Sequence, residues 1–168
     1  MGLLNVCTGF NLGEFEGISE FQLSSATPSP VPAPSPNLPV RSLVAVQGIV
    51  YCKSCKYQGV NTLLGASPLT GAVVRLQCNN SKIPLREEAK TDKNGYFFLQ
   101  PSKMITSYGA HKCKVFLVSS PVNSCQKPTD LHLGQNGAFL RYQKSQKPTP
   151  FALYSVGPFA FESTSCPH

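Results

Sequence analysis

The sequence of 168 residues has no tryptophan and few runs of residues that favour a helix. It also has no stretch of about 18 apolar residues, which excludes insertion into a membrane through a helix. Proline and glycine are frequent instead, with 15 and 13 residues, and predict a turn-rich chain of β-strands. A hydrophobic content of 41% is enough for a packed core. The length leaves room for one domain and a tail.

Basic residues are missing from residues 1–40, which contain only acidic charges. Residues 41–168 hold all 15 Lys and Arg residues against five acidic ones, a net charge of +10. A basic domain of this kind attracts polyanions, which include nucleic acid, anionic membranes and acidic polysaccharides. Charge alone does not indicate which of these polyanions is the partner.

The cysteines favour one of these classes. Cys7 stands alone, and six lie in the basic region: Cys52, Cys55, Cys78, Cys113, Cys125 and Cys166. An even number in a compact domain indicates disulfides, and hence an exported protein. The alternatives for Cys52-x-x-Cys55 are a redox pair, which needs a strand–helix context, and a zinc site, which needs a second close pair. Neither is visible, so we expect no cofactor and no metal. Disulfides indicate the wrong compartment for binding to nucleic acid, and the sequence has no nucleic-acid recognition motif. Nucleic acid is therefore not the expected partner.

The first 40 residues form two segments. Residues 1–25 lack the basic region and apolar stretch of a signal peptide. There are two alternatives. Export uses a missing upstream segment, or residues 1–25 come from a wrong first exon or a truncated reading. We favour the second alternative. Residues 26–40 form a proline-rich spacer, which we expect to be a disordered arm in extended polyproline II. Its expected sites of hydroxylation and O-glycan attachment are Pro28, Pro30, Pro32, Pro34 and Pro36.

Residues 41–168 are expected to form one β domain. Alternating apolar and polar residues predict strands over residues 43–51, 72–78 and 112–119. A turn at Asp92-Lys93-Asn94-Gly95 precedes a strand over 96–99, and shorter strands are expected over 138–142 and 152–161. Gly48 is expected at a bulge or a close approach. Many short strands with frequent turns predict a small antiparallel β-barrel or sandwich.

Several of these segments resemble one known family. They are Val46–Cys55 (VQGIVYCKSC), Gly71–Cys78 (GAVVRLQC), Thr91–Phe97 (TDKNGYF), Cys113–Pro121 (CKVFLVSSP), Cys125 and Tyr154–Phe159 (YSVGPF). The ordered six-cysteine pattern is similar to that of the pollen Ole e I-like allergen and extensin family. Within it, the chain most resembles the cysteine-containing domain of proline-rich and arabinogalactan cell-wall proteins.

The resemblance implies a β-barrel closed by three disulfides, Cys52–Cys125, Cys55–Cys166 and Cys78–Cys113, although sequence alone leaves fifteen connectivities open. It also implies a non-enzymatic extracellular glycoprotein of the cell wall. Its basic domain would bind acidic or galactan-rich pectic polysaccharide and help to cross-link the wall, and other wall glycoproteins would be further partners. Root or pollen development is the process implied. The alternative is a secreted signalling protein that acts on a receptor. No carboxylate pair, nucleophile–base pair or phosphate-binding loop indicates an enzyme.

Two kinds of binding or modification site are expected in the domain. Asn79-Asn80-Ser81 is an acceptor for N-glycosylation, and its alternative is an ordinary polar turn. Basic and aromatic side chains that would stack on sugar rings and attract uronate carboxylates are Lys53, Lys56, Tyr57, Arg75, Lys112 and Lys114. For any single one of them, a solubilising surface position is the alternative.

Overall fold

The computed structural model of the chain describes residue 30 and residues 41–79, 84–101 and 105–167. The chain divides into two units, Met1–Leu38 and Pro39–His168, and the second contains all but one of the described residues. Pro30 is exposed, whereas Cys7, Pro28, Pro32, Pro34 and Pro36 lie outside the described residues. The described residues contain β-strands and three short 3-10 turns but no α-helix, so the predicted all-β class is confirmed.

The strands are short except for the first. In order they are β1 (Leu43–Cys52), β2 (Ser67–Pro68), β3 (Val73–Cys78), β4 (Leu85–Lys90), β5 (Tyr96–Leu99), β6 (Cys113–Ser119), β7 (Lys127–Pro128), β8 (Ala138–Phe139), β9 (Arg141–Tyr142), β10 (Phe151–Ser155) and β11 (Phe159–Glu162). The 3-10 turns are η1 (Cys55–Tyr57), η2 (Ala110–Lys112) and η3 (Leu131–Leu133).

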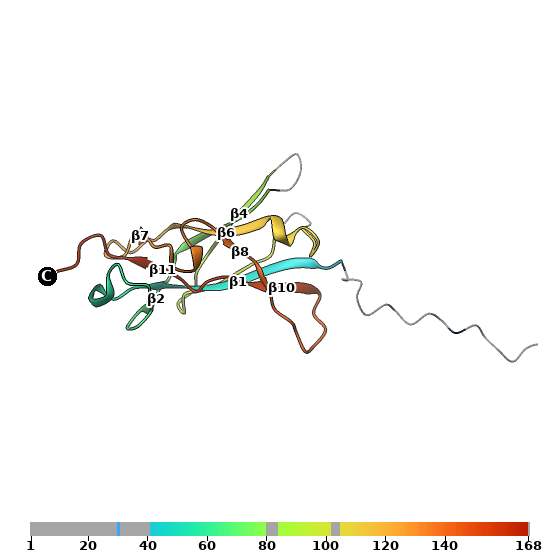
Figure 1. The fold of residues 1–168 in the computed structure, drawn as a ribbon, viewed down its shortest axis with the longest axis horizontal. Helices are drawn as coiled ribbons and strands as arrows, with labels where there is room; N and C mark the ends of the chain where they lie inside the picture. Colours follow the sequence, from blue (N-terminus) through green and yellow to red (C-terminus); the bar gives the residue numbers. More distant parts are fainter. Residues whose placement is uncertain (1–29, 31–40, 80–83, 102–104, 168) are drawn as a thin grey trace, which may run out of the picture. The chain divides into compact units, whose positions relative to one another are not determined.

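These strands form two sheets. The larger sheet has seven strands in the order β7-β11-β1-β10-β9, with β2 and β5 also paired to β1. The smaller sheet has four strands in the order β4-β3-β6-β8. In Figure 1, β1 runs through the domain and the strands of the smaller sheet lie on one side of it. Because the sheets keep separate edges, the domain is a sandwich and not a closed barrel.

Most strand pairs are antiparallel, as predicted, but two of the pairs that β1 makes are not. Both β10 and β11 run parallel to β1, pairing with residues 43–47 and 50–52 respectively. The side chains of a strand alternate between the two faces whichever way its neighbour runs, so alternation cannot reveal direction. The continuous apolar run at the start of β1 was the available signal, because strands in parallel pairing are often buried on both faces. Val44, Ala45 and Val46 are all fully buried.

Two predicted strands are each divided in the structure, and one strand was missed. The strand expected over 152–161 is divided into β10 and β11 at Val156-Gly157-Pro158, where proline provides no amide for the ladder. The strand expected over 138–142 is two short strands in different sheets. β4 was not predicted, because only Leu85 of its six residues is buried and the other five give little apolar pattern.

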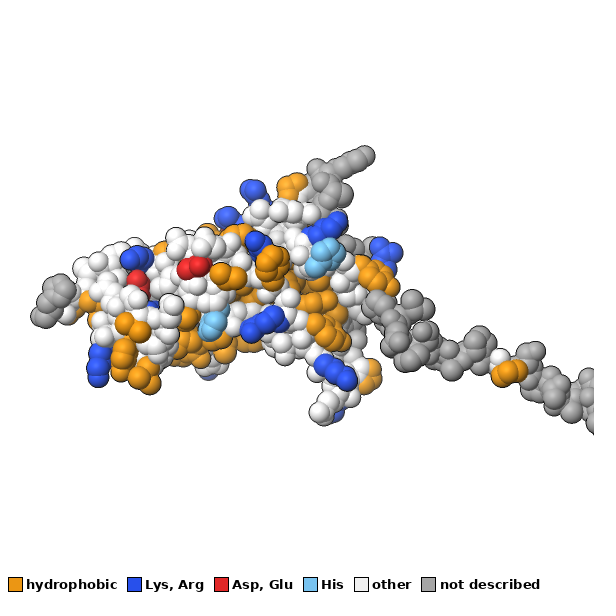
Figure 2. Space-filling view, in the orientation of Figure 1, with side chains coloured by type: hydrophobic (Ala, Val, Ile, Leu, Met, Phe, Trp, Pro, Cys, Tyr) orange, Lys and Arg blue, Asp and Glu red, His pale blue; other side chains and the backbone are white. Residues whose placement is uncertain are grey.

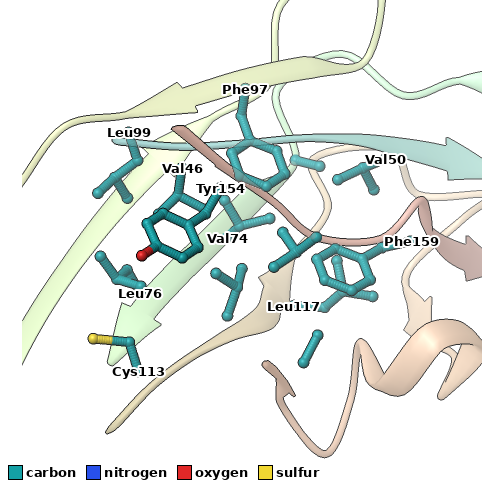
Figure 3. Packing of buried hydrophobic residues seen from close by; sticks show 14 of the residues in the cluster. Val46, Val50, Val74, Leu76, Phe97, Leu99, Cys113, Leu117, Tyr154 and Phe159 are labelled. Carbon is teal, nitrogen blue, oxygen red and sulfur yellow. The ribbon is translucent and has the colours of Figure 1, made fainter. Parts of the chain in front are cut away.

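The core lies between the two sheets. Val46 and Val50 of β1 face Val74 and Leu76 of β3, and the large rings of Phe97 and Phe159 fill the space between them (Figure 3). All of these side chains are fully buried. The predicted inner faces of β3 and β6 are confirmed, since Val74, Leu76, Cys78, Cys113, Val115 and Leu117 are buried while their neighbours are not.

Two glycines allow close approaches. A Cβ atom on Gly48 would lie 2.7 Å from the ring of Phe97, so the predicted close-approach position is confirmed. Gly95 ends the predicted turn with a φ of 73°, and there a Cβ would lie 2.4 Å from the carbonyl oxygen of Val50. The Asp92 carboxylate accepts hydrogen bonds from the amides of Asn94 and Tyr96 in this turn, which connects β4 in one sheet to β5 in the other.

Three disulfides join Cys52 to Cys125, Cys55 to Cys166 and Cys78 to Cys113, the pairs that the family resemblance implies. Cys78–Cys113 links the neighbouring strands β3 and β6 of the smaller sheet, where the two residues are paired. The other two bridges attach distant segments to Cys52 at the end of β1 and to Cys55 in η1, across 73 and 111 residues. In the chain-entropy model, bridges that close such long loops each stabilise the fold by about 4–5 kcal/mol.

Candidate functional site: a basic face on the smaller sheet

The outer face of the smaller sheet gathers basic side chains from three neighbouring strands. The register of the sheet places Arg86 of β4 and Lys114 of β6 on either side of Gln77 in β3. Two residues earlier in β3, Arg75 lies between Glu88 of β4 and Phe116 of β6. Lys90 of β4 lies opposite Val73 of β3. Paired residues of neighbouring strands share a face, so we name Arg75, Arg86, Lys90 and Lys114, with Glu88 among them, the basic face.

An ion pair offsets part of this charge. The Nε and Nη2 atoms of Arg75 lie 3.0 and 2.9 Å from one carboxylate oxygen of Glu88. Both side chains are substantially exposed, and surface pairs of this kind stabilise a protein by about 0–1 kcal/mol. The pair therefore fixes the direction of Arg75 more than it stabilises the fold. Arg86 and Lys90 are exposed on the same face.

An aromatic side chain extends the basic face at β8. Phe139 pairs with Lys114, and the Lys114 ammonium lies 4.6 Å from the centre of the Phe139 ring. Contacts of a cation with a ring face at this distance are attractive. The Phe139 ring nevertheless remains 57% exposed. A flat ring beside a cation offers a sugar both a stacking surface and a partner for a carboxylate.

Two of the predicted glycan-binding residues thus lie together, and a third is close in sequence. Arg75 and Lys114 share the basic face, and Lys112 is exposed immediately before β6. The carbonyl of Lys112 accepts a hydrogen bond from the amide of Asn79, which is itself exposed where β3 ends. Asn79 has the loop position that a glycosylation acceptor needs, and its occupancy stays a prediction. Ser81 of the acceptor motif lies outside the described residues.

The prediction for Lys53 is wrong. Its side chain is only 4% exposed and pairs with the buried Glu162 of β11, with 3.4 Å between the Lys53 Nζ and a carboxylate oxygen. Lys127 reaches the other oxygen of Glu162 at 3.5 Å, and the Gly59 amide donates to the first. The Lys53 ammonium also donates to the carbonyl of Val60. Lys53 is therefore bound inside the protein and is not available to a polysaccharide.

This cluster shifts the titration of Glu162. Burial alone would raise the pKa of the Glu162 carboxyl, but the hydrogen bond from Gly59 and the charges of Lys53 and Lys127 outweigh it, so the pKa lies below the ordinary value. The charged form is thus the stable one. The cluster attaches the loop after η1 to β11, which is a structural role.

Lys56 and Tyr57 lie apart from the basic face. Both belong to η1, beyond the end of β1, and the Lys56 ammonium lies 5.5 Å from the centre of the Tyr57 ring. Lys56 is exposed and Tyr57 half-buried. The structure therefore does not bring the six predicted residues into one site. Figure 2 likewise shows Lys and Arg side chains spread over the visible face, with few acidic ones between them.

A cleft on the larger sheet was not predicted. It has a volume of about 300 Å³ and lies on the outer face of β1, β5 and β10, beside Arg141 of β9. Its polar groups form a chain, in which the Tyr96 hydroxyl donates to Gln47 at 3.0 Å and Gln47 donates to Ser155 at 3.4 Å. Tyr51 adds a second ring. Burial, followed by the charge of Asp92, raises the pKa of Tyr96, which keeps its hydroxyl protonated. The sequence signal for this cleft was the alternation in β1, which places Gln47, Ile49 and Tyr51 on the outer face between buried neighbours.

The described residues show neither a metal site nor a membrane span. No three His, Cys, Asp or Glu side chains among them are grouped closely enough to hold a metal ion. No helix in the same part of the chain has the length and apolar composition needed to cross a bilayer.

The fold and its disulfides define a small β-sandwich protein built like a pollen allergen. The crystal structure of the major plantain pollen allergen Pla l 1 matches with a TM-score of 0.52 at 24% identity, covering 74% of this chain and 96% of that one. None of the protein-family models compared with the chain matches it.

Sequence relatives give the family. The chain is 34% identical over 129 residues to the seed and root hair protective protein of Arabidopsis thaliana, covering 71% of this chain and 73% of that protein. It is 47% identical over 134 residues to the non-classical arabinogalactan protein 30 of Arabidopsis thaliana, and 44% identical over 131 residues to the pistil-specific extensin-like protein of Nicotiana tabacum. The chain belongs to the pollen Ole e I-like allergen and extensin family of plant proteins.

The last two matches cover 76% and 71% of this chain but 55% and 30% of the relatives, so this chain spans about half or less of their lengths. Two of the three relatives are named as an arabinogalactan protein and an extensin-like protein, and none of the three names is that of an enzyme. Membership of this family supports a non-enzymatic role in the plant cell wall, and three disulfides suit an oxidising compartment.

Proposed function

We propose that the protein is an extracellular cell-wall glycoprotein, without enzymatic activity, whose basic face binds acidic pectic polysaccharide. The observation that supports this most directly is the register of β4, β3 and β6, which places four cations and, among the described residues of these strands, one acidic side chain on the same face. A polymer of uronic acids presents carboxylates along an extended chain. A sheet face is a suitable counterpart, because its side chains repeat at regular spacings in two directions.

The proposal has a second part for neutral sugars. The cleft with Tyr51, Tyr96 and Gln47 offers rings for stacking and a chain of hydroxyl and amide groups, which suits the galactan-rich portions of pectic polymers. Together with the proline-rich segment, two surfaces for polysaccharide would let one molecule help to cross-link the wall.

Binding to two immobilised polymers over a salt series tests this function. Polygalacturonate binding should be strong at low salt and fall steeply as the salt concentration rises, because screening at 0.1 M acts over about 10 Å. Binding to neutral galactan should change little over the same series. Absence of polygalacturonate binding at low salt would contradict the proposal, and equal salt dependence for both polymers would contradict the division between the two surfaces.

A further inference from the structure

A short segment joins the two sheets, and a hollow of about 290 Å³ lies beside it. Residues 138–142 begin as β8 in the smaller sheet and end as β9 in the larger one. We name the hollow the junction hollow; it is lined by His132, Leu133, Ala138, Phe139, Arg141 and Gly157. Phe139 also contacts Lys114 of the basic face, and Arg141 also lines the cleft on the larger sheet. The junction hollow therefore connects the two surfaces that we assign to polysaccharide.

Strand register places a line of outward side chains across the smaller sheet. Gln77 of β3 is paired with Arg86 of β4 on one side and with Lys114 of β6 on the other. Lys114 is in turn paired with Phe139 of β8. Paired residues of neighbouring strands share a face, so these four side chains form one line that ends at the junction hollow.

The line continues across the larger sheet. Leu140 packs against the core, so the residues on either side of it point outward. Ser155 of β10 is paired with Arg141 of β9 and with Gln47 of β1, and the Gln47 amide donates to the Ser155 hydroxyl. We name the complete line the outer row; from end to end it consists of Arg86, Gln77, Lys114, Phe139, Arg141, Ser155, Gln47 and Tyr96. None of its side chains is buried, and none is acidic.

The backbone beside the junction hollow holds an apolar side chain at the surface. His132 and Leu133 have φ values of 51° and 63°, in the left-handed region that residues other than glycine rarely adopt. The loop is fixed on both sides, since the Asp130 carboxylate accepts from the amide and the side chain of Asn136, and His132 Nδ1 lies 2.7 Å from the carbonyl oxygen of Pro158. Leu133 is 48% exposed. An apolar contact surface is therefore available at the edge of the junction hollow.

Arg141 gives the junction hollow its positive charge. Its Nη2 atom donates to the carbonyl of Gly157 at 2.8 Å, and none of the ion pairs among the described residues includes it. A guanidinium group has five N–H donors in a fork that matches a carboxylate. Arg141 thus has donors for an anionic ligand in the middle of the outer row.

We propose that a single pectic polymer lies along the outer row and crosses from the basic face to the cleft over the junction hollow. This inference rests on the proposed function and adds the way in which the polymer is bound. Uronate carboxylates pair with Arg86, Lys114 and Arg141, and sugar rings pack on Phe139 and Leu133. Neutral sugars of the same polymer occupy the cleft. The domain thereby selects polymers in which acidic and neutral sugars are covalently joined, and a cross-link to a second polymer needs the proline-rich segment.

The first test compares joined and separate sugars by isothermal titration calorimetry with the full-length protein. One probe is a soluble pectin fragment that carries galactan side chains. The other is a polygalacturonate fragment of equal uronate content, titrated in the presence of free neutral galactan. The joined fragment should bind at least about tenfold more tightly, because its second contact is made within one complex.

The second test places a charge in the junction hollow. Leu133→Asp introduces a carboxylate that repels uronates, and Leu133→Asn is its matched control with the same shape and no charge. The left-handed backbone at this position suits both replacements. Leu133→Asp should weaken binding of the joined fragment about tenfold more than Leu133→Asn does. Binding of neutral galactan should be the same in both variants, and near-ultraviolet circular dichroism verifies that each is folded.

Two results would overturn the inference. They are equal affinity for the joined fragment and for the separate sugars, and equal binding of the joined fragment by the two Leu133 variants. If polygalacturonate and galactan each bind as proposed but joining them brings no gain, only the single-polymer arrangement fails. Absence of polygalacturonate binding at low salt would instead contradict the proposed function itself.

Discussion

The outer faces of the two sheets differ in chemistry although both cover one core. The smaller sheet presents Arg75, Arg86, Lys90 and Lys114 around a single acidic side chain. The larger sheet presents a cleft with two tyrosines and an amide, and Arg141 as its charged group. Among the described residues, the basic face therefore carries more charge than the cleft, whose lining is mostly neutral. Under the proposed function, acidic sugars of a wall polymer bind the basic face and neutral sugars bind the cleft.

The greatest loss of stability should come from the inner face of the larger sheet, in contrast to its outer face. Phe97 and Phe98 are neighbours on β5, but Phe97 is 1% exposed and Phe98 is 42% exposed. Phe97→Ala should lower the free energy of unfolding by about 3–5 kcal/mol, because it leaves a cavity between the sheets. Phe98→Ala should lower it by less than about 1 kcal/mol. Denaturant titration followed by circular dichroism measures both, and similar losses would mean that the outer ring is as firmly packed as the inner one.

The next effect compares a buried ion cluster with an exposed pair. Glu162→Gln leaves Lys53 buried without its anion and should lower the free energy of unfolding by about 3 kcal/mol. Glu88→Gln removes the exposed partner of Arg75 and should lower it by about 0–1 kcal/mol. Equal losses in urea titrations at pH 7 would show that burial of the Glu162 cluster does not matter.

The same cluster predicts a dependence on pH. The folded protein holds the pKa of Glu162 below its ordinary value, so the unfolded chain takes up the proton first as the pH falls. The stability that Glu162 contributes is therefore complete above its unfolded pKa and is lost as the pH falls through its folded pKa. The difference in unfolding free energy between the protein and Glu162→Gln should shrink over that acidic range. A constant difference from pH 7 to pH 2 would contradict the shift.

A smaller effect distinguishes the disulfides by exposure. Cys78, Cys113 and Cys125 are buried, whereas Cys55 is exposed and Cys166 half-buried. A reductant reaches exposed sulfur first, so limited dithiothreitol should open Cys55–Cys166 before the other two bridges. Alkylation followed by peptide mass mapping gives the order. Earlier alkylation of Cys78 and Cys113 would mean that the smaller sheet opens more readily than the chain terminus.

The sequence predicted well what depends on local pattern. Alternation placed the inner and outer residues of β3 and β6 correctly, and the Asp92–Gly95 turn follows from residues that stabilise it among themselves. Lys53 was misassigned because its partner, Glu162, is 109 residues away, and only the fold brings the two together. The parallel pairing of β1 with β10 is similarly remote, since the residues paired there lie more than 100 positions apart.

The candidate sites show the same division. Arg75 and Lys114 could be assigned to outward positions from their strands alone, but their common face with Arg86 depends on β4, whose polar sequence gives little strand signal. The cleft combines residues of β1, β5, β9 and β10 and needs their order in the sheet. Single strands could be predicted, and surfaces shared among strands could not.

We expect the position of the positive charges, and not only their number, to determine binding to acidic polysaccharide. Arg86→Gln with Lys114→Gln removes two charges from the basic face, and Lys56→Gln with Lys144→Gln removes two exposed charges from other elements. In binding to polygalacturonate at low salt, the first pair should weaken affinity about fivefold, at about 0.5 kcal/mol for each charge, and the second pair much less. Equal weakening by the two pairs would contradict a defined basic face and leave only net charge as the cause.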